Sequence, residues 1–148
     1  MVRVLLVADV PWVLNDARAT LSGPGYELLD TTDPSSAAAT AYEFDVDVVV
    51  ADLQVGSMGG MAITRHVRAY AGRTGRAAPA VVMLLDRSAD AWLARRAAAD
   101  GWVAKPFTAR QIRSAITTAL ERPIAGAGDD GRGDGSAGIV PAEPVAGG

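Results

Sequence analysis

Residues 46–53 have the sequence VDVVVADL, in which an apolar run is closed by an aspartate. Consecutive valines without polar alternation are typical of a strand that is buried on both faces of a parallel sheet. Two other runs share this character, Val4–Val7 upstream and Ala80–Leu85 downstream. These three segments predict the centre of a parallel sheet.

Weaker strand patterns and helical patterns alternate with these runs. Tyr26–Thr31, after the turn sequence SGPG, and Trp102–Ala104 are the weaker candidate strands. The candidate helices are recognised by helical spacing of apolar residues, by a proline in the first turn or by an N-terminal capping residue. They are Pro11–Leu21, the stretch from Asp33-Pro34 to Tyr42, Gly60–Tyr70, Ala89–Ala99 and Thr108–Leu120. Strand and helix thus alternate five times, which predicts an α/β fold with a five-stranded parallel, doubly wound sheet.

Composition excludes several classes of protein. The 148 residues suit one domain, and a formal net charge of −3 gives no electrostatic footprint for nucleic acid. The absence of cysteine excludes disulfide frameworks and thiolate metal sites. No apolar run reaches the length of a membrane span or of a signal peptide, so we expect a soluble, cytoplasmic protein.

The C-terminal part has a different composition from the rest. Residues 123–148 hold eight of the 16 glycines and three of the eight prolines, with few large apolar side chains. Such a segment cannot offset its ordering entropy by burial. We therefore expect one folded domain over residues 1–121 and a flexible tail over residues 122–148.

Three side chains of catalytic type follow predicted strands. Asp9, Asp52 and Lys105 come at the ends of the first, third and fifth strands, and the carboxyl ends of parallel strands meet at one edge of the sheet. Two neighbouring carboxylates favour a hard cation between them, and a lysine can pair with a carboxylate or a phosphate. The alternative is that these three side chains are merely solvated.

The motifs together resemble a response-regulator receiver domain of the chemotaxis-regulator type over residues 2–121. The resemblance is carried by Val4–Asp9, Asp47–Leu53 with Met58–Gly60, Val81–Arg87 and Asp100–Phe107. It implies a flavodoxin-like (βα)5 fold with strand order 2-1-3-4-5. The Lys-Pro-Phe ending of the last motif is the most specific of these features.

The resemblance also implies a chemistry. Asp52 would be the phospho-acceptor, phosphorylated by a histidine kinase or a phosphotransfer protein. Mg²⁺ would be held by Asp9, Asp52 and the backbone carbonyl of Gln54. Lys105 would contact the phosphoryl group, its bond to Pro106 is a candidate cis peptide, and Trp102 stands at the aromatic switch position.

Several positions depart from the family pattern. Ala8 replaces one of two acidic residues, which predicts a weakened magnesium site. Leu85 replaces the hydroxyl residue that binds the phosphoryl group, so the coupling to the switch aromatic lacks a hydrogen bond. Asp86 replaces a small residue and adds negative charge near the site. Gly56 and Gly59 replace the usual proline and aspartate, from which we expect a looser loop.

Aromatic and arginine side chains predict a partner-binding face. Such residues are enriched at interfaces, and six of them are expected on the face built from the fourth helix, fifth strand and fifth helix: Trp92, Arg95, Arg96, Trp102, Arg110 and Arg113. For Trp92, a solvated helix surface is an equally good interpretation.

Two functions compete, and neither is enzymatic. The first is a stand-alone receiver of a two-component phosphorelay that signals through protein contacts. The second is a phosphorylation-independent pseudo-receiver that docks as an accessory subunit in a larger assembly, for example a respiratory or other membrane-bound complex. A haloacid-dehalogenase-type phosphatase would need an aspartate where Gln54 stands, and a flavodoxin would need a phosphate loop after Val4–Val7.

Overall fold

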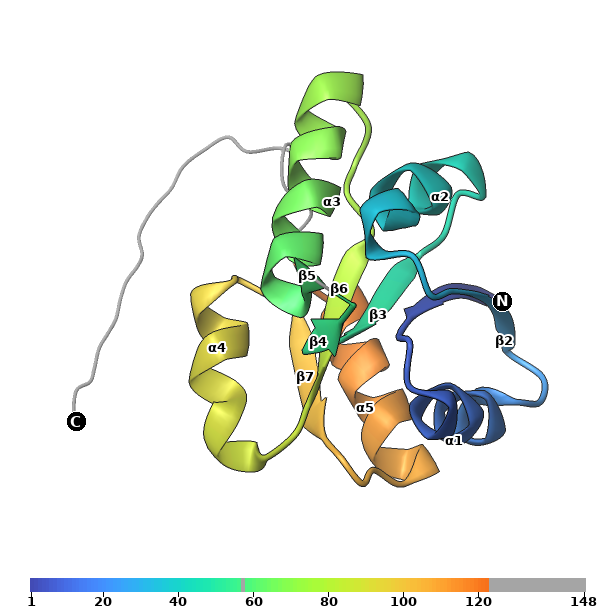
Figure 1. The fold of residues 1–148 in the computed structure, drawn as a ribbon. Coiled ribbons are helices and arrows are strands. Elements are labelled where there is room, and N and C mark those ends of the chain that lie inside the picture. The colour runs from blue at the N-terminus through green and yellow to red at the C-terminus, as the bar shows by residue number, and fades with distance from the viewer. Residues whose placement is uncertain (57, 123–148) are drawn as a thin grey trace.

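A computed structural model describes residues 1–56 and 58–122 of the chain (Figure 1). Five parallel strands form one sheet in the order β2-β1-β3-β6-β7, which is the predicted order 2-1-3-4-5. The strands are β1 (Val2–Val7), β2 (Tyr26–Thr31), β3 (Val48–Asp52), β6 (Ala80–Leu85) and β7 (Gly101–Ala104). The residues of β3 and β6 are all buried, as their continuous apolar sequences predict.

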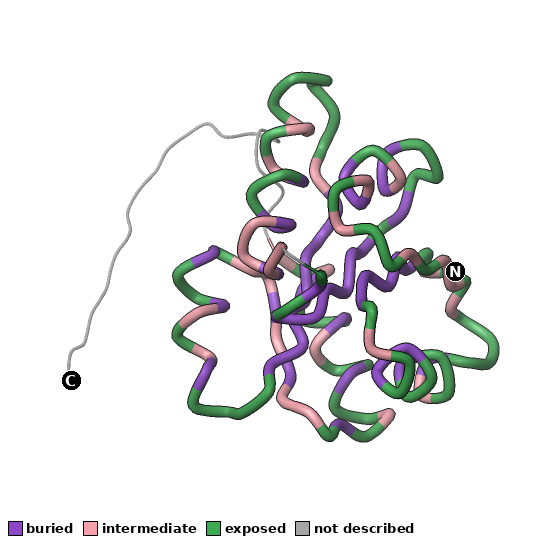
Figure 2. Tube along the Cα trace, viewed as in Figure 1, coloured by how far each residue is buried: buried purple, intermediate pink, exposed green. Residues whose placement is uncertain are grey.

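Helices cover both faces of the sheet. They are α1 (Pro11–Leu21), α2 (Ala37–Glu43), α3 (Gly60–Thr74), α4 (Ala91–Arg96) and α5 (Ala109–Leu120). In Figure 1, α1 and α5 lie together on one side of the sheet, and α2 and α3 lie together on the other. Alternate side chains of the central strands feed two apolar clusters, one on each face, so burial is concentrated along the strands (Figure 2).

The boundaries of α1 and the C-terminal end of α5 agree with the predictions, whereas α3 continues four residues beyond the predicted end at Tyr70. The segment after Asp33 begins as a 3₁₀ turn, Pro34–Ser36, before α2, and a second 3₁₀ turn, Ser88–Asp90, precedes α4. The predicted helix Ala89–Ala99 is therefore shorter, and Ala98, at φ 60°, lies beyond its end in the left-handed region. The capping box of Thr108 and Gln111 forms as predicted at the start of α5.

The segment after Asp52 contains a short hairpin. Gln54–Val55 (β4) and Met58–Gly59 (β5) pair antiparallel, with Gly56 turning at φ 56°. A Cβ atom at Gly60 would lie 2.8 Å from the carbonyl oxygen of Asp52, so glycine there lets the chain pack closely against the end of β3. The looseness expected from Gly56 and Gly59 stays a prediction.

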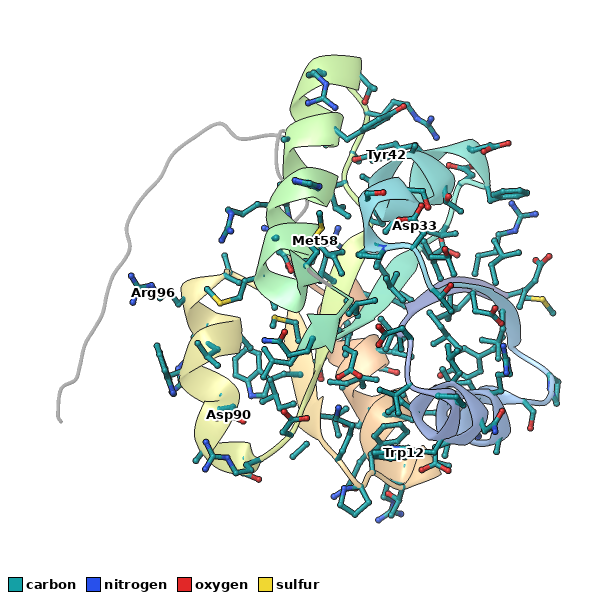
Figure 3. All side chains as sticks on the ribbon, in the orientation of Figure 1. Trp12, Asp33, Tyr42, Met58, Asp90 and Arg96 are labelled. Carbon is teal, nitrogen blue, oxygen red and sulfur yellow. The ribbon has the colours of Figure 1, made fainter. Side chains whose placement is uncertain are left out.

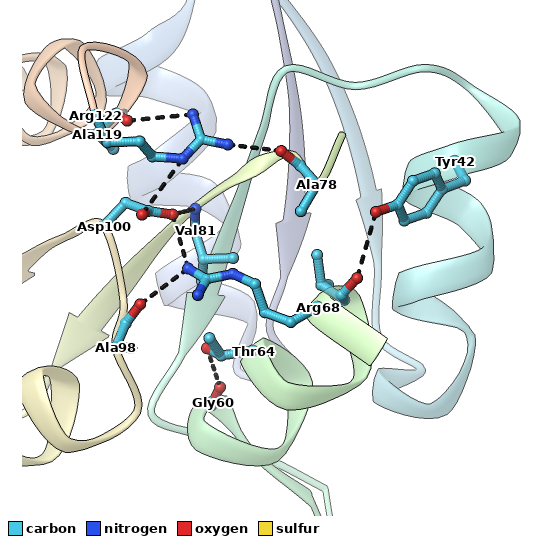
Figure 4. Close-up of polar contacts among 11 residues, drawn as sticks. Tyr42, Gly60, Thr64, Arg68, Ala78, Val81, Ala98, Asp100, Ala119 and Arg122 are labelled. Atoms are coloured by element: carbon cyan, nitrogen blue, oxygen red, sulfur yellow. Dashed lines mark hydrogen bonds and ion pairs between the residues drawn. The ribbon is translucent and has the colours of Figure 1, made fainter. Parts of the chain in front are cut away.

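A polar network lies at the end of the sheet where β6 and β7 begin (Figure 4). Asp100 accepts hydrogen bonds from the backbone amide of Val81 at 2.8 Å and from Arg68 of α3 at 3.0 Å. Its other oxygen lies 3.3 Å from Nε of Arg122. Arg122 also donates to the carbonyl of Ala78 at 2.6 Å. The network thus ties α3, the end of α5 and two strands together.

Arg122 therefore belongs to the folded part of the chain, although it was assigned to the tail. The rest of the predicted tail, residues 123–148, lies outside the described residues, so its flexibility stays a prediction. Within the described part of the chain, none of the helices has both the length and the apolar composition needed to cross a bilayer.

Candidate functional site

The carboxyl ends of the central strands bring ionisable side chains together. Asp52 is the last residue of β3, and strand register places it beside Leu84 of β6. Asp86 directly follows β6, and Lys105 directly follows β7. Because all the strands are parallel, these residues share one edge, as the sequence predicted.

Lys105 lies between two carboxylates. Its Nζ is 2.6 Å from Oδ1 of Asp52 and 3.0 Å from Oδ1 of Asp86. The side chains of Lys105 and Asp52 are 9% and 3% exposed, whereas that of Asp86 is 60% exposed. The site therefore has a buried carboxylate, a nearly buried ammonium group and a second carboxylate at its mouth.

Burial and charge act in opposite directions on these groups. Burial raises the pKa of Asp52 above its usual value, and the hydrogen bond from Lys105 only partly offsets this. Burial alone would lower the pKa of Lys105, but hydrogen bonds to Asp52 and Asp86 outweigh it, so that this pKa is raised. One ammonium group shared by two carboxylates stays protonated and leaves the site with excess negative charge.

Asp9 reaches the same edge through the hairpin that follows β3. Its Oδ2 accepts a hydrogen bond of 2.7 Å from the amide of Gly56. Oδ1 of Asp52 accepts hydrogen bonds from Lys105 and from the amide of Leu53, while within residues 1–56 and 58–122 its Oδ2 accepts none. A buried carboxylate oxygen with no partner among the described residues, at the end of the sheet where Asp9 also lies, suits a hard cation such as Mg²⁺.

The cation donors are few. Among the described residues, no group of three or more acidic, histidine or cysteine side chains could hold a metal ion. The predicted set of Asp9, Asp52 and the carbonyl of Gln54 has only two carboxylates, because Ala8, 2% exposed, stands where a third could be. The residues present fit Mg²⁺ by donor type.

Trp12, at the beginning of α1, lies over Lys105. The ammonium nitrogen is 5.9 Å from the centre of the indole ring, which is within range of a cation–π contact. Trp12 is 51% exposed and lies at the outside of the molecule near α1 and α5 (Figure 3). The position of Trp12 three residues after Asp9 in the sequence indicates a location near the site. The pairing of Asp86 with Lys105 has no such signal in the sequence.

The predicted switch positions form one apolar cluster. Leu85 is 1% exposed and packs with Leu53, Met83 and Ala94, and Trp102 packs against the same cluster. The guanidinium group of Arg95 lies 5.8 Å from the centre of the Trp102 ring. Leu85 and Trp102 thus share one apolar cluster, and the side chain at position 85 carries no hydroxyl group.

The predicted partner face is assembled in part. Trp92 is 52% exposed on α4, and Arg96 extends outward from the end of the same helix (Figure 3). Arg110 lines a cavity of about 530 Å³ beside β7, together with Trp102 and residues of α5. These positions lie on α4, β7 and α5, and their role in binding a partner stays a prediction.

Arg113 does not belong to this surface. It donates to the carbonyl oxygens of Thr20 and Ser22 at the end of α1, at 3.0 and 3.2 Å, and lies over the ring of Tyr26. The guanidinium group of Arg113 thus reaches the end of α1, and Arg113 is not among the residues that line the cavity beside Arg110. Its assignment to the partner face was therefore wrong.

Comparison with protein families supplies the deciding observation. The family model of the response regulator receiver domain matches residues 4–117, which covers all the site residues described above. The chain belongs to this family.

Relatives of this receiver domain include the transcriptional regulatory protein KdpE of Mycobacterium tuberculosis, which is 30% identical over 128 residues. The match covers 86% of this chain but 54% of KdpE, so the chain spans about half the length of that relative.

Solved structures agree with the fold. A two-component response regulator of the LuxR family from Aurantimonas superposes with a TM-score of 0.67 at 30% identity, covering 80% of this chain and 84% of that one. The receiver domain of the sensor histidine kinase PA1611 from Pseudomonas aeruginosa, described with a magnesium ion in its active-site cleft, gives 0.68 at 23% identity, covering 81% and 98%. Receiver domains are signalling modules of two-component systems, and phosphorylation and Mg²⁺ binding are general features of them.

Proposed function

We propose that this receiver domain accepts a phosphoryl group on Asp52 in the cytoplasm, from a histidine kinase or phosphotransfer protein, and signals by contact with another protein. The observation that carries the proposal is the pairing of Lys105 with Asp52 at 2.6 Å, at the end of a buried central strand. An isolated solvated aspartate would have neither the buried position nor the ammonium partner.

The transfer is a displacement at phosphorus. An ionised oxygen of Asp52 forms a bond to the phosphorus atom while the bond to the donor breaks, and the donor leaves with that electron pair. Lys105 is held in position to pair with the phosphoryl oxygens, which gain a partner as the carboxylate loses its charge.

Asp9, Asp52 and the carbonyl of Gln54 would hold Mg²⁺. When bound, the ion neutralises negative charge on the phosphoryl oxygens and the carboxylates. Two observations support this assignment: Oδ2 of Asp52 has no hydrogen-bond partner within residues 1–56 and 58–122, and Asp9 is exposed. The missing carboxylate at Ala8 predicts weaker binding than a site with three carboxylates would give.

The output is proposed to lie on the surface formed by α4, β7 and α5. The exposed Trp92, the stacked pair of Arg95 and Trp102, and Arg110 beside the cavity have the chemistry of interface hot spots. That the receiver domain acts without a further folded domain stays a prediction. Measuring the mass of the protein in a cell extract tests it.

The test is a mass measurement on the purified protein. Incubation with Mg²⁺ and acetyl phosphate is expected to add one phosphoryl group, which hydrolyses over time and does not form on Asp52→Asn. Asp45→Asn, which removes an exposed carboxylate 81% accessible to solvent, is the control and should be phosphorylated normally. Absence of an adduct on the wild-type chain would reject the acceptor function.

The second candidate is the phosphorylation-independent docking subunit. Leu85, buried and without a hydroxyl group, favours it, because the hydrogen bond that would couple a phosphoryl group to Trp102 cannot form. In that case the native partner would bind wild type and Asp52→Asn equally, and Trp92→Ala would weaken both.

A further inference from the structure

The carboxylate of Asp86 engages the one ammonium group that the phosphoryl group needs. Lys105 Nζ lies 3.0 Å from Asp86 and 2.6 Å from Asp52, so the cation already has two anionic partners. Its third neighbour is the ring of Trp12 at 5.9 Å. A phosphoryl group on Asp52 would therefore meet a lysine that is already neutralised.

Charge balance makes this arrangement unfavourable for phosphorylation. Transfer to Asp52 replaces one carboxylate charge by a phosphoryl group that carries close to two negative charges. The carboxylate of Asp86, the second partner of Lys105, would lie within a few ångströms of the phosphoryl group, and the two negatively charged groups would repel each other. With Leu85 in place of a hydroxyl residue, no side chain at that position offers the phosphoryl oxygens a compensating hydrogen bond.

We propose that Asp86 is a built-in competitor for Lys105 that slows phosphorylation of Asp52. The inference rests on the proposed acceptor function and assigns to this site a residue that sets its reactivity. Because Asp86 is 60% exposed, its carboxylate can turn away into solvent at small cost. Asp86 thus acts as a brake on the transfer and does not prevent it.

In the reaction, the ammonium group changes partners. The Asp52 oxygen bonds to phosphorus, the bond from phosphorus to the leaving acetate of acetyl phosphate breaks, and acetate departs with the electron pair. Lys105 keeps its three protons throughout and exchanges its contact with Asp86 for one with a phosphoryl oxygen. No oxidant, reductant or further group is needed.

The experiment measures the initial rate of adduct formation with acetyl phosphate and Mg²⁺ for four chains: wild type, Asp86→Asn, Asp86→Glu and Asp45→Asn. Asp86→Asn keeps the shape of the side chain and removes the charge, and it is expected to react about fivefold to tenfold faster. Asp86→Glu keeps the charge and should react like wild type. Asp45→Asn changes the net charge equally at a distant exposed position and should also react like wild type.

Ionic strength gives a readout that a packing role would not affect. Repulsion by an exposed carboxylate is screened, so the advantage of Asp86→Asn should shrink toward about twofold between roughly 0.05 M and 0.5 M salt. The thermal unfolding midpoints of all four chains should agree, since Asp86 and Asp45 are both exposed.

The outcomes separate this inference from the proposed function. If adducts form and Asp86→Asn reacts no faster than wild type, or Asp45→Asn is accelerated equally, Asp86 has no such role while Asp52 remains the acceptor. If none of the four chains forms an adduct, the acceptor function is rejected and the inference with it.

Discussion

Each end of the parallel strands carries a cluster of three mutually paired charged side chains, and the central charge is positive in one cluster and negative in the other. The Lys105 cluster consists of Lys105 with Asp52 and Asp86. The Asp100 cluster consists of Asp100 with Arg68 and Arg122. In the first, one cation serves two carboxylates, and one buried carboxylate oxygen has no partner among the described residues. In the second, one carboxylate serves two cations, and both of its oxygens are used.

The difference separates a structural role from a reactive one. The Asp100 cluster pairs both oxygens of a partly buried carboxylate and joins elements that are distant in sequence, so it stabilises the fold. The Lys105 cluster has excess negative charge and a carboxylate oxygen with no partner among the described residues, so binding of a cation or a phosphoryl group should stabilise it. The same substitution, aspartate to asparagine, should therefore have opposite effects on stability at the two edges.

The largest effect is expected for Asp100→Asn. The variant leaves Arg68 and Arg122 without their carboxylate, and the free energy of unfolding should fall by about 3 kcal/mol. Urea denaturation monitored by circular dichroism measures it. The control Asp45→Asn removes the exposed ion pair with Arg76 and should cost about 0.5 kcal/mol or less. Equal losses in the two variants would remove the distinction between a structural cluster and ordinary surface charge.

Leu85→Thr is expected to lower the free energy of unfolding by about 2 kcal/mol, because it removes buried methyl groups and places a hydroxyl in an apolar cluster. The control Leu85→Met conserves volume and should cost less than about 1.5 kcal/mol. A phosphoryl adduct that perturbs Trp102 fluorescence in Leu85→Thr and not in wild type would assign the missing coupling to the hydroxyl position. A Leu85→Thr variant as stable as wild type would contradict the tight apolar packing of Leu85.

Asp52→Asn is expected to raise the free energy of unfolding by about 1 kcal/mol in metal-free buffer, since burial raises the pKa of the wild-type carboxyl despite Lys105. A carboxyl group whose pKa is raised on folding destabilises the protein above that pKa. The gain should thus be full at neutral pH and disappear as the pH falls below the ordinary aspartate pKa. Added Mg²⁺ should stabilise wild type more than the variant. Destabilisation by Asp52→Asn at neutral pH without metal would show that Lys105 compensates its burial completely.

The smallest effect is expected for Asp86→Asn, whose exposed pair with Lys105 should change stability by about 0.5 kcal/mol or less. Urea unfolding alongside Asp100→Asn measures the contrast. If Asp86→Asn lowered the free energy of unfolding as much as Asp100→Asn does, Asp86 would be a structural residue. Its effect on the phosphorylation rate could then not be separated from an effect on stability.

Periodicity and strand-end residues predicted most of the fold and the centre of the site. The continuous apolar runs of β3 and β6 are buried as expected, and the predicted approach of Lys105 to Asp52 is found, because parallel strands must end at a common edge. The cis geometry of the Lys105–Pro106 bond is likewise as expected. The roles of Gln54 as a ligand and of Asp52 as acceptor remain predictions.

Other features depended on contacts that no local pattern encodes. Arg113 was assigned to the wrong flank of α5 because its partners are backbone carbonyls more than 90 residues away. The pairing of β4 with β5 needed the close approach of Gly60 to the end of β3. The Asp100 cluster joins side chains of three separate segments, and no local pattern indicates which arginines pair with Asp100.

The sequence by itself determined the parallel α/β fold, the edge at which Asp52 and Lys105 meet, and the loss of a hydroxyl at Leu85. These follow from side-chain type and from the periodicity of strands and helices. Only the tertiary structure decided how the charges are shared, with Lys105 held between Asp52 and Asp86 and Asp100 held between two arginines. Ion pairing depends on distances of a few ångströms and on burial, and both arise only when segments far apart in the chain pack together.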